Sequence, residues 1–470
     1  MARSSTGQGT SVACRAMAKT ENKKQMEFLP QEALVMAAEH PRTLRNRLAK
    51  LHASELGELL LACKDDDERI TILGRIPEAL RGDVLLELPE GMQEDLLASL
   101  APSEIEGVVE HLDSDDATDI LQAVGKEVAD EVIGRLEPED RREIEPLLEH
   151  DEESAGGLMQ AELFKVRDDW EVQKVLEVLR RFGHEIENLN YVYVVDDTDR
   201  LTGVIPLHKL LFCSPDDSVA RILDPDFPQV HAGQDQEDVA RIFERYDVLA
   251  LPVVDDDGVL VGRITADDIL DVVQEEATED MYRLAALSDQ DDLAEPVGIT
   301  AWRRGVWLTV NLGTAILASL VIAQFEATIA QIVALAVLMP IVASMGGIAG
   351  TQTLTVIVRG IALGRVTFET ERRALIKEVT VSVVTGLSFA VVMGLIASLW
   401  FPALGAKLGI VIAAAMMINL LAAGLSGALI PLTLQRVHID PALASGTILT
   451  TVTDVVGFFA FLGLATVFLL

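Results

Sequence analysis

The sequence has few cysteines, few aromatic residues and little positive charge for its length. Its 470 residues include only three cysteines, Cys14, Cys63 and Cys213, which lie far apart and show no CxxC spacing. Such sparse cysteines favour a reducing compartment and show no zinc-binding pattern. Aromatic residues make up 5% of the chain and the formal net charge is −36. Base stacking and attraction to a phosphate backbone are both disfavoured, so we expect no nucleic-acid partner.

The sequence also lacks the usual marks of an enzyme and of a secreted protein. No P-loop and no nucleophile–base constellation occurs, which argues against a soluble enzyme. Residues 1–25 are basic and rich in Ser, Thr and Gly but contain no apolar core, so we expect no signal peptide. We interpret residues 1–30 as a disordered N-terminal segment, or as an over-extended start upstream of Met17 or Met26.

Charge is missing from five long runs in the second half of the chain. Apart from Asp454, no Asp, Glu, Lys or Arg occurs in 305–325, 327–358, 379–406, 408–435 or 441–470. Each run is long enough to cross ~30 Å of hydrocarbon, which takes about 20 helical residues. From Pro296 onward the chain has 9 basic and 6 acidic residues, so residues 1–295 hold 29 basic and 68 acidic ones. The pattern predicts a very acidic soluble region followed by a five-span α-helical transmembrane domain at 301–470.

The basic residues between the spans predict the orientation in the membrane. Basic residues occur before the first span at 303–304, between the second and third at 359–378, and between the fourth and fifth at 436–438. The loops after the first and third spans hold only Glu326 and Lys407. We therefore expect a multi-pass protein in the lipid of the cytoplasmic (inner) membrane. Its soluble region would be cytosolic and its C-terminus outside.

Residues 31–152 repeat a short helical pattern. Segments such as LRNRLAKL (44–51), RGDVLLEL (81–88) and ADEVIGRL (129–136) place apolar residues at helical spacing, and Pro-containing or acidic turns separate them. The spacing predicts an acidic all-α domain, in which helices of about ten residues stack into a superhelix. By itself the pattern favours an interaction or packing scaffold, and a regulatory role needs further evidence.

A direct repeat with an offset of 59 residues follows. YVVDDTDRLTGVIPLHKLL (193–211) matches PVVDDDGVLVGRITADDIL (252–270), and each copy predicts strand, acidic turn, strand and helix, preceded by a further helix. The repeat resembles the α/β CBS-domain pair, which we place at 153–277, with copies at 153–218 and 219–277.

In the CBS family the motif G-x-x-T-x-x-D offers its Thr and Asp to a nucleotide. The second copy has Thr265 and Asp268 at these positions, whereas the first has Pro206 and Lys209. The resemblance therefore leaves ATP binding by the second copy open and disfavours it in the first.

An acidic segment leads from the second copy through a connecting helix, which we place at 278–300, to Trp302 in the first span. Carboxylates recur in it at near-helical spacing: Asp268, Asp271, Glu275, Glu276, Glu279 and Asp280. A solvated helix face is the simpler interpretation. However, like charges at i, i+3 and i, i+4 repel one another without a counter-ion, and a shift of this helix would matter because the span follows directly.

Asp454 is the only charged residue between Asp440 and the C-terminal Leu470. An ionised carboxylate at the bilayer centre costs roughly 2.5–3.5 kcal/mol, so such residues usually face a protein interior or a water-filled path. The neighbouring small and hydroxyl residues share its helical face: Thr447, Thr450, Thr451 and Gly457. Oxygen ligands suit hard cations such as Mg²⁺ and Ca²⁺. We expect Thr450, Thr451, Asp454 and Gly457 to contribute to an ion-binding pore.

Two other spans carry motifs. In the second span Pro340 predicts a bend, and Gly346, Gly347 and Gly350 allow close backbone approach. Close helix packing and a pore-lining helix are both open interpretations of this span. In the fourth span Asn419 favours an inter-helix hydrogen bond over ion binding.

Taken together, these motifs resemble the MgtE-type magnesium channel/transporter family from about residue 40 to the end. The resemblance rests on the segment HDEESAGGLMQ, the CBS pair, EEATED, Trp307 with Asn311, Glu326, the glycine-rich second span, DPALASG and TDVVG. One position departs from the family: its GGN motif reads Gly346-Gly347-Ile348.

The resemblance implies a homodimer with a Mg²⁺ pore between subunits, at which Asp454 helps to hold the ion. It also implies that cytosolic Mg²⁺ bound at the acidic domains closes the pore. The implied regulatory residues are carboxylates of the soluble region and connecting helix: Asp115, Asp119, Asp235, Glu237, Asp247, Asp268, Asp271, Glu275, Glu276, Glu279 and Asp280. Electrostatics agrees with this scheme, because divalent ions would bring together domain surfaces that repel one another without them.

Two alternatives remain. Ile348 in place of the family's Asn leaves room for another divalent cation, such as Co²⁺. A non-transporting membrane receptor whose CBS pair senses nucleotide belongs to a different class, and the oxygen-rich face around Asp454 argues against it.

Overall fold

The computed structural model describes residues 29–184, 186, 188–285, 287, 297–367, 370–437, 439–442 and 445–470. Four features from the sequence analysis lie wholly or partly outside these residues: the N-terminal segment at 1–30, His438, the DPALASG motif and the connecting helix at 278–300. The chain forms two compact units, Met1–Ile269 and Leu270–Leu470.

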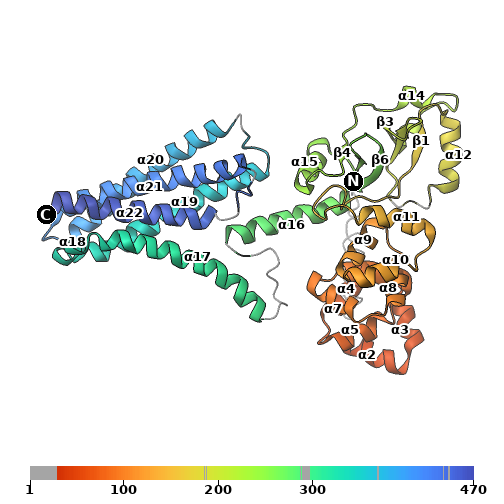
Figure 1. The fold of residues 1–470 in the computed structure, drawn as a ribbon, viewed down its shortest axis with the longest axis horizontal. Coiled ribbons are helices and arrows are strands. Elements are labelled where there is room, and N and C mark those ends of the chain that lie inside the picture. The colour runs from red at the N-terminus through yellow and green to blue at the C-terminus, as the bar shows by residue number, and fades with distance from the viewer. Residues whose placement is uncertain are drawn as a thin grey trace, which may run out of the picture. The chain divides into compact units, whose positions relative to one another are not determined.

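The first unit begins with short helices, as the apolar repeat predicts (Figure 1). They are α2 Pro30–Glu39, α3 Pro41–Leu48, α4 Ala53–Leu61, α5 Asp66–Leu73, α6 Arg81–Leu86, α7 Glu90–Ala98, α8 Pro102–Val109, α9 Ser114–Ala123, α10 Lys126–Ile133 and α11 Pro138–Leu147, with the 3₁₀ turn η1 at Glu78–Leu80. Their apolar positions, including Leu44, Leu60, Ile72 and Ile120, form one continuous buried core. The all-α prediction for this region is confirmed.

Two three-stranded sheets follow, one for each copy of the sequence repeat. The first contains β1 Lys165–Arg167, β2 Tyr191–Val195 and β3 Leu201–Pro206, and the second contains β4 Val230–His231, β5 Ala250–Val254 and β6 Leu260–Thr265. In both, the first strand pairs parallel with the second, and the second pairs antiparallel with the third. The antiparallel pairs are those the repeat predicts. The short strands β1 and β4 were not predicted, because two or three residues show no recognisable alternation.

Helices complete the two copies. α12 Val172–Phe182 and α13 Leu207–Leu210 belong to the first, and α15 Gln236–Tyr246 and the start of α16 Ala266–Leu284 belong to the second. α14 Val219–Ile222 starts the second copy in the sequence, but Val219 and Ile222 pack into the core of the first. Val194 pairs with Gly203 and Val253 with Gly262, so the two copies share one register. Both glycines lie against backbone, since a Cβ would come within 2.7 Å of the Asp224 carbonyl oxygen or 2.8 Å of that of Gln160.

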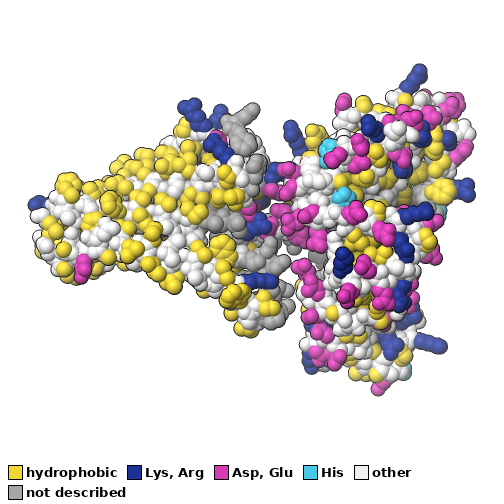
Figure 2. All heavy atoms as spheres, in the orientation of Figure 1, with side chains coloured by type: hydrophobic (Ala, Val, Ile, Leu, Met, Phe, Trp, Pro, Cys, Tyr) yellow, Lys and Arg dark blue, Asp and Glu magenta, His cyan; other side chains and the backbone are white. Residues whose placement is uncertain are grey.

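The second unit contains five helices that are long and apolar enough to cross a membrane, counted over the described residues. They are α17 Val297–Ala323, α19 Ala334–Ala362, α20 Glu371–Trp400, α21 Gly405–Arg436 and α22 Ser445–Leu469, and a short helix, α18 Glu326–Gln331, lies before α19. In Figure 2 hydrophobic side chains are frequent over the visible surface of this unit, and charged ones are few. The five-span prediction is confirmed, and the chain is a membrane protein by this criterion.

The helix ends differ from the charge-free runs of the sequence. The run 327–358 breaks where α18 ends and α19 begins, and α20 starts at Glu371 inside the predicted basic loop. Glu378, which the sequence places among the loop charges, is therefore helical and buried, and its Oε2 accepts a hydrogen bond from Thr353 Oγ1 at 3.2 Å. Charged residues near span ends extend a transmembrane helix beyond its apolar run, so charge alone does not mark where a helix stops.

α21 is the central helix of this unit, because it packs against α19, α20 and α22. Glycines make these contacts close: a Cβ at Gly427 would lie 2.7 Å from the carbonyl oxygen of Gly350 on α19, and one at Gly409 would lie 2.5 Å from that of Gly394 on α20. Small residues at helix crossings are the usual basis of packing in membranes. The arrangement fixes α19 and α22 relative to one another.

Candidate ion path and acidic clusters

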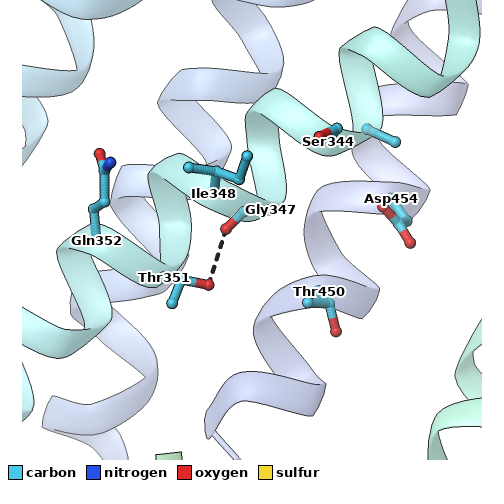
Figure 3. Close-up of a pocket in the computed structure, with 8 residues that line it drawn as sticks. Ser344, Gly347, Ile348, Thr351, Gln352, Thr450 and Asp454 are labelled. Atoms are coloured by element: carbon cyan, nitrogen blue, oxygen red, sulfur yellow. Dashed lines mark hydrogen bonds between the residues drawn. The ribbon is translucent and has the colours of Figure 1, made fainter. Parts of the chain in front are cut away.

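An open groove of about 500 Å³ lies between α19 and α22 in the second unit. Its lining comes from six residues of α19 and two of α22: Ala343, Ser344, Gly347, Ile348, Thr351, Gln352, Thr450 and Asp454. Figure 3 shows Thr450 and Asp454 on one face of α22, with Gly347 and Thr351 on α19. A half-buried carboxylate therefore shares a groove with several oxygen-bearing residues.

Two hydroxyl groups in the groove, those of Thr450 and Thr351, donate their protons to carbonyl oxygens of their own helices. Thr450 Oγ1 donates to the carbonyl oxygens of Gly446 and Thr447 at 3.1 Å, and Thr351 Oγ1 donates to that of Gly347 at 3.0 Å (Figure 3). With the proton so used, each hydroxyl oxygen keeps lone pairs that can accept hydrogen bonds or coordinate a cation. Together with the Asp454 carboxylate, this chemistry suits a hard cation or its water shell.

The groove includes some of the sequence-predicted pore residues and omits others. Thr450 and Asp454 line it, whereas Thr451 and Gly457 do not. Thr451 donates to the Thr447 carbonyl oxygen at 2.7 Å, and Gly457 is buried against Asn419. Adjacent helical residues point about 100° apart, so Thr450 and Thr451 face different surroundings.

The same division applies to the residues predicted on α19. Gly347 lines the groove, but Pro340, Gly346 and Gly350 do not. A Cβ at Gly346 would meet Asn419 at 2.2 Å and one at Gly350 would meet Leu449 at 2.8 Å, so these glycines serve helix packing.

Sequence reasoning missed several groove residues on α19, namely Ala343, Ser344, Thr351 and Gln352. A signal was available, since Ser344, Gly347 and Thr351 are spaced i, i+3, i+7 in the same way as the Thr and Asp residues of α22. The glycines of this span predicted close helix packing, so its hydroxyl-bearing face was not identified.

A second cluster lies in the first unit, where α9 faces the start of α16. Asp115 is buried, and its pKa is raised well above the usual range by burial and then by the charges of Asp116 and Asp268. Burial also raises the pKa of Asp116 to about 7, with the Asp268 charge as the next cause. Asp119 adds to the same field. The pKa values of Asp115 and Asp116 are therefore raised by carboxylates on α9 and on α16, two segments far apart in the sequence.

Asp116 is the member of this cluster that the sequence analysis did not name. In the motif LDSDDATD it lies between the predicted Asp115 and the turn of helix that leads to Asp119. Its backbone N–H donates to Asp115 Oδ1 at 2.9 Å. Only the fold shows that residues 115 and 116 both approach Asp268, because adjacent helical residues normally point about 100° apart.

Asp268 also interacts with Thr265, the other residue proposed for nucleotide binding. Thr265 Oγ1 donates to Asp268 Oδ2 at 2.7 Å, and the Thr265 backbone N–H approaches the same oxygen at 3.3 Å. This arrangement stabilises the first turn of α16, since it satisfies a backbone donor that a helix start leaves unpaired. Thr265 and Asp268 are thus adjacent, and their observed contact is with each other.

The remaining carboxylates predicted on the second CBS copy lie at the two ends of α15. Asp235 caps its start by accepting from the Glu237 backbone N–H at 2.9 Å, and the Glu237 carboxylate pairs with Arg241 at 2.7 Å. Asp247 follows the last turn in a left-handed conformation, with φ 50°. α15 therefore separates Asp247 from Asp235 and Glu237.

The carboxylates of α16 beyond Ile269 belong to the second unit. Glu279 pairs with Arg283, and Arg283 also pairs with Asp440 in the segment between α21 and α22. Leu284 packs against an apolar cluster of Leu354, Val358, Ala442 and Leu449. The end of α16 is thereby attached to α19 and to the start of α22. The other predicted residues of this stretch, Asp271, Glu275, Glu276 and Asp280, lie on the same helix.

No group of three or more His, Cys, Asp or Glu side chains in the described part of the chain converges on one metal position. Mg²⁺ usually keeps several of its waters and contacts one or two carboxylates, so the facing pair Asp116 and Asp268 fits the chemistry of a hydrated Mg²⁺.

These features define a class: a multi-span membrane protein with an oxygen-lined groove, preceded by an acidic helical domain and a tandem CBS module. Family models match three parts of the chain. The divalent cation transporter model MgtE matches 339–464, the MgtE intracellular N domain matches 51–153, and the CBS domain matches 155–216 and 219–275. The chain belongs to the MgtE family, as 36% identity over 90% of its length to one curated member also shows.

That relative is the magnesium transporter MgtE of Thermus thermophilus, of which the match covers 94%. The magnesium transporter MgtE of Bacillus subtilis is 33% identical over 72% of this chain and 74% of its own. Among solved structures, the cytosolic domain of the Mg²⁺ channel MgtE in complex with ATP is 39% identical, covers 52% of this chain and 98% of its own, and has a TM-score of 0.48.

Proposed function

We propose that this protein imports Mg²⁺ across the cytoplasmic membrane through an ion path that includes the groove between α19 and α22. The observation that carries the proposal is the half-buried Asp454 carboxylate, which shares the groove with Thr351 and Thr450 on helices long enough to span a membrane. The relatives named as magnesium transporters support the identity of the ion. In this assignment Asp454 offsets part of the cost of dehydrating Mg²⁺.

A homodimer fits the open shape of this groove. Ile348, which lines it, has 55% of its surface exposed. A second copy of the chain would close the open side and convert the groove into a pore. Partners of the protein are then a second subunit, membrane lipid and Mg²⁺ itself, and the soluble unit faces the cytosol.

Closure by cytosolic Mg²⁺ is the second part of the proposal. The charge of Asp268 raises the pKa values of Asp115 and Asp116, so a divalent cation among these carboxylates relieves a repulsion that is present without it. Because α16 carries Asp268 in its first turn and Leu284 at its end packs against Leu354 and Leu449, it provides a physical link from this cluster to α19 and α22. The acidic residues of α15 and α16 contribute further weak sites, and several weak sites suit a sensor.

ATP binding rests on Thr265 and Asp268 of the second CBS copy. Since each is the other's hydrogen-bond partner, a nucleotide would have to replace that contact. Nucleotide and Mg²⁺ would then compete for Asp268, and ATP titration at two Mg²⁺ concentrations tests this.

Co²⁺ is the alternative cargo, and the observation that favours it is Ile348. This apolar side chain lines the groove at a position where the family motif has an amide. Loss of a neutral oxygen ligand alters the geometry available to the ion without removing the carboxylate.

Uptake into proteoliposomes with Mg²⁺, Ca²⁺, Co²⁺ and Ni²⁺ in turn, for the wild type and Asp454→Ala, tests the function. We expect Mg²⁺ uptake that Asp454→Ala abolishes. A stronger response to Co²⁺ would select the alternative cargo. Unchanged uptake in Asp454→Ala would instead support a receptor that does not transport.

A further inference from the structure

Asn419 lies at the point where three membrane helices meet. The side chain, on α21, has no exposed surface, and its Nδ2 donates to the Val342 carbonyl oxygen on α19 at 2.8 Å. A Cβ at Gly346 on α19 would lie 2.2 Å from this nitrogen, and one at Gly457 on α22 would lie 2.7 Å from it. The amide therefore fills the space that these two glycines leave open.

Each contact of Asn419 is next to a residue that lines the groove. Val342 precedes Ala343, Gly346 precedes Gly347, and Gly457 lies three residues after Asp454. Asn419 is thus behind both walls of the groove and contacts the two helices that form it. A change in the size of this side chain or in its hydrogen bond alters the distance between α19 and α22.

Burial of the Asn419 amide is also destabilising. Asn419 Oδ1 has no hydrogen-bond partner among the described residues. A buried acceptor without a partner is destabilising, whereas an apolar side chain of the same shape would leave nothing unsatisfied. Local rules of this kind are broken mainly where function requires it.

We propose that Asn419 is a positioning residue for cation selectivity, which rests on the ion path proposed above. Its hydrogen bond to α19 and its contact with Gly457 set the distance between Asp454 and the oxygens of α19. Mg²⁺ requires near-octahedral ligands at about 2.0–2.1 Å, whereas Ca²⁺ accepts more variable geometry at about 2.3–2.6 Å. A groove that is free to widen would therefore lose its preference for Mg²⁺ over Ca²⁺.

Asn419→Leu tests the proposal, because Leu has a similar branched shape but neither donor nor acceptor. We expect the full-length variant to melt at the wild-type temperature or above it, since the unpartnered acceptor is gone. In proteoliposomes we expect the ratio of Mg²⁺ to Ca²⁺ uptake to fall about fivefold, the equivalent of one buried hydrogen bond. A role confined to packing would move the melting temperature and leave this ratio unchanged.

Ser382→Ala is the matched control. Ser382 Oγ lies against Gly424 on α21, and Ser382 is on α20, which contributes nothing to the groove lining. We expect this variant to keep the wild-type ratio of Mg²⁺ to Ca²⁺ uptake. A ratio that falls equally in Ser382→Ala and Asn419→Leu would mean that any change around α21 has this effect, and would overturn the proposal.

Gly346→Ala provides a second route to the same displacement, because the added Cβ pushes the Asn419 amide from the α19 side. A lowered ratio of Mg²⁺ to Ca²⁺ uptake in this variant supports the proposal even where Asn419→Leu does not fold. Failure of both variants to fold would make Asn419 a determinant of the fold and overturn its role in selectivity.

Asp454→Ala in the same assay keeps the two proposals distinguishable. Wild-type uptake in Asp454→Ala would reject the ion path itself. Lost uptake in Asp454→Ala combined with an unchanged ratio in Asn419→Leu would reject only the role of Asn419.

Discussion

The carboxylates of Asp454 and Asp116 lie in different electrostatic surroundings. Asp454 shares its groove with hydroxyl oxygens whose protons are donated to their own helix, so it has no fixed cation beside it in that lining. Asp116 faces other carboxylates, and its pKa is raised to about 7. The first environment suits an ion that passes through, and the second suits an ion or proton that is held.

Asp454→Asn should separate stability from transport. The amide is nearly isosteric, retains one oxygen and is cheaper to bury than a charge, so the melting temperature in detergent should stay the same or rise. Mg²⁺ flux into liposomes should fall by most of its value, because the negative charge that offsets dehydration is gone. Loss of stability and flux together would indicate a structural Asp, and wild-type flux would remove Asp454 from the ion path.

The stability of the first unit should depend on pH through Asp116. Its pKa is raised from 3.8 to about 7 in the folded chain, so between these values the unfolded chain releases a proton that the folded chain retains. The contribution of Asp116 to stability without Mg²⁺ should therefore be greatest below this window, fall as pH rises through it, and level off above about pH 7. Mg²⁺ should restore more stability at pH 8 than at pH 5.

Chemical denaturation of the full chain at several pH values, with and without Mg²⁺, measures this dependence. Asp116→Asn should flatten the pH profile and reduce the Mg²⁺ effect, whereas Glu94→Gln, an exposed carboxylate on α7, should change neither. An Asp116→Asn profile that matches the wild type would mean that the carboxylate does not titrate as described.

At the scale of helices, α16 and α21 differ in where they contact the rest of the chain. α16 begins beside the acidic cluster and ends in a polar and apolar attachment to the rest of the second unit, through Arg283 and Leu284. α21 contacts three neighbouring helices through glycines that lie against backbone or small polar side chains. Anchors at both ends would let α16 transmit movement in the proposed closure, whereas close contacts along α21 hold the groove helices in place.

Neutralising Glu276 and Glu279 together, to Gln, should weaken closure rather than conduction. Fewer carboxylates on α16 leave fewer ligands for cytosolic Mg²⁺, so a higher Mg²⁺ concentration should be needed to stop flux. Flux at low Mg²⁺ should be unchanged. Closure at the wild-type Mg²⁺ concentration would favour the interpretation of this stretch as a solvated face.

Arg283→Gln is the matched variant for that experiment, because Glu279 already pairs with Arg283 in the structure. It removes the contacts of Arg283 with both Glu279 and Asp440 while keeping every carboxylate. If the Glu276 and Glu279 effect came only from losing this ion pair, Arg283→Gln would reproduce it in full.

Gly409→Ala should destabilise the second unit. The new Cβ would lie 2.0 Å from Ser398 Oγ and 2.5 Å from the Gly394 carbonyl oxygen, so α20 and α21 would have to separate. Overpacking of this kind costs about 1–3 kcal/mol. Gly313→Ala on α17 has no atom within 4 Å of the new Cβ and should be neutral or stabilising. Thermal unfolding in detergent compares the two, and equal melting temperatures would contradict the packing role of α21.

At the scale of the whole molecule, charge and apolarity are separated along the chain. Residues 1–295 hold 68 of the 74 acidic residues, while the five long apolar helices all lie after Pro296. In Figure 2 Asp and Glu side chains are frequent on the visible face of the first unit. Such an excess of one sign disfavours compact arrangements unless cations neutralise it.

Residues 31–295 purified alone should therefore change shape with Mg²⁺. Limited proteolysis with and without millimolar Mg²⁺ should show slower cleavage in its presence, because neutralised carboxylates allow closer packing. NaCl of equal ionic strength is the control, since a monovalent salt only screens charge. Equal cleavage rates with the two salts would count against a Mg²⁺ sensor.

The sequence by itself determined the elements whose periodicity or charge spans many residues. Ten-residue apolar repeats predicted the helical N-terminal domain, the 59-residue repeat predicted the paired sheets, and five charge-free runs predicted the five spans. It also singled out Asp454, because a lone charge in an apolar run is visible without a fold. The sequence did not predict short strands such as β1 or the true ends of α20, because their limits depend on pairing and packing.

Only the tertiary structure decided which residues share a site. Helical spacing grouped Thr451 and Gly457 with Asp454, yet packing leaves only Thr450 and Asp454 of this group in the groove and buries Gly457 against Asn419. Likewise Asp116 and Asp268 are more than 150 positions apart in the sequence, and only the fold brings their charges close enough to interact. Spacing along a helix specifies the direction of a side chain, but what lies in that direction depends on the neighbouring helices.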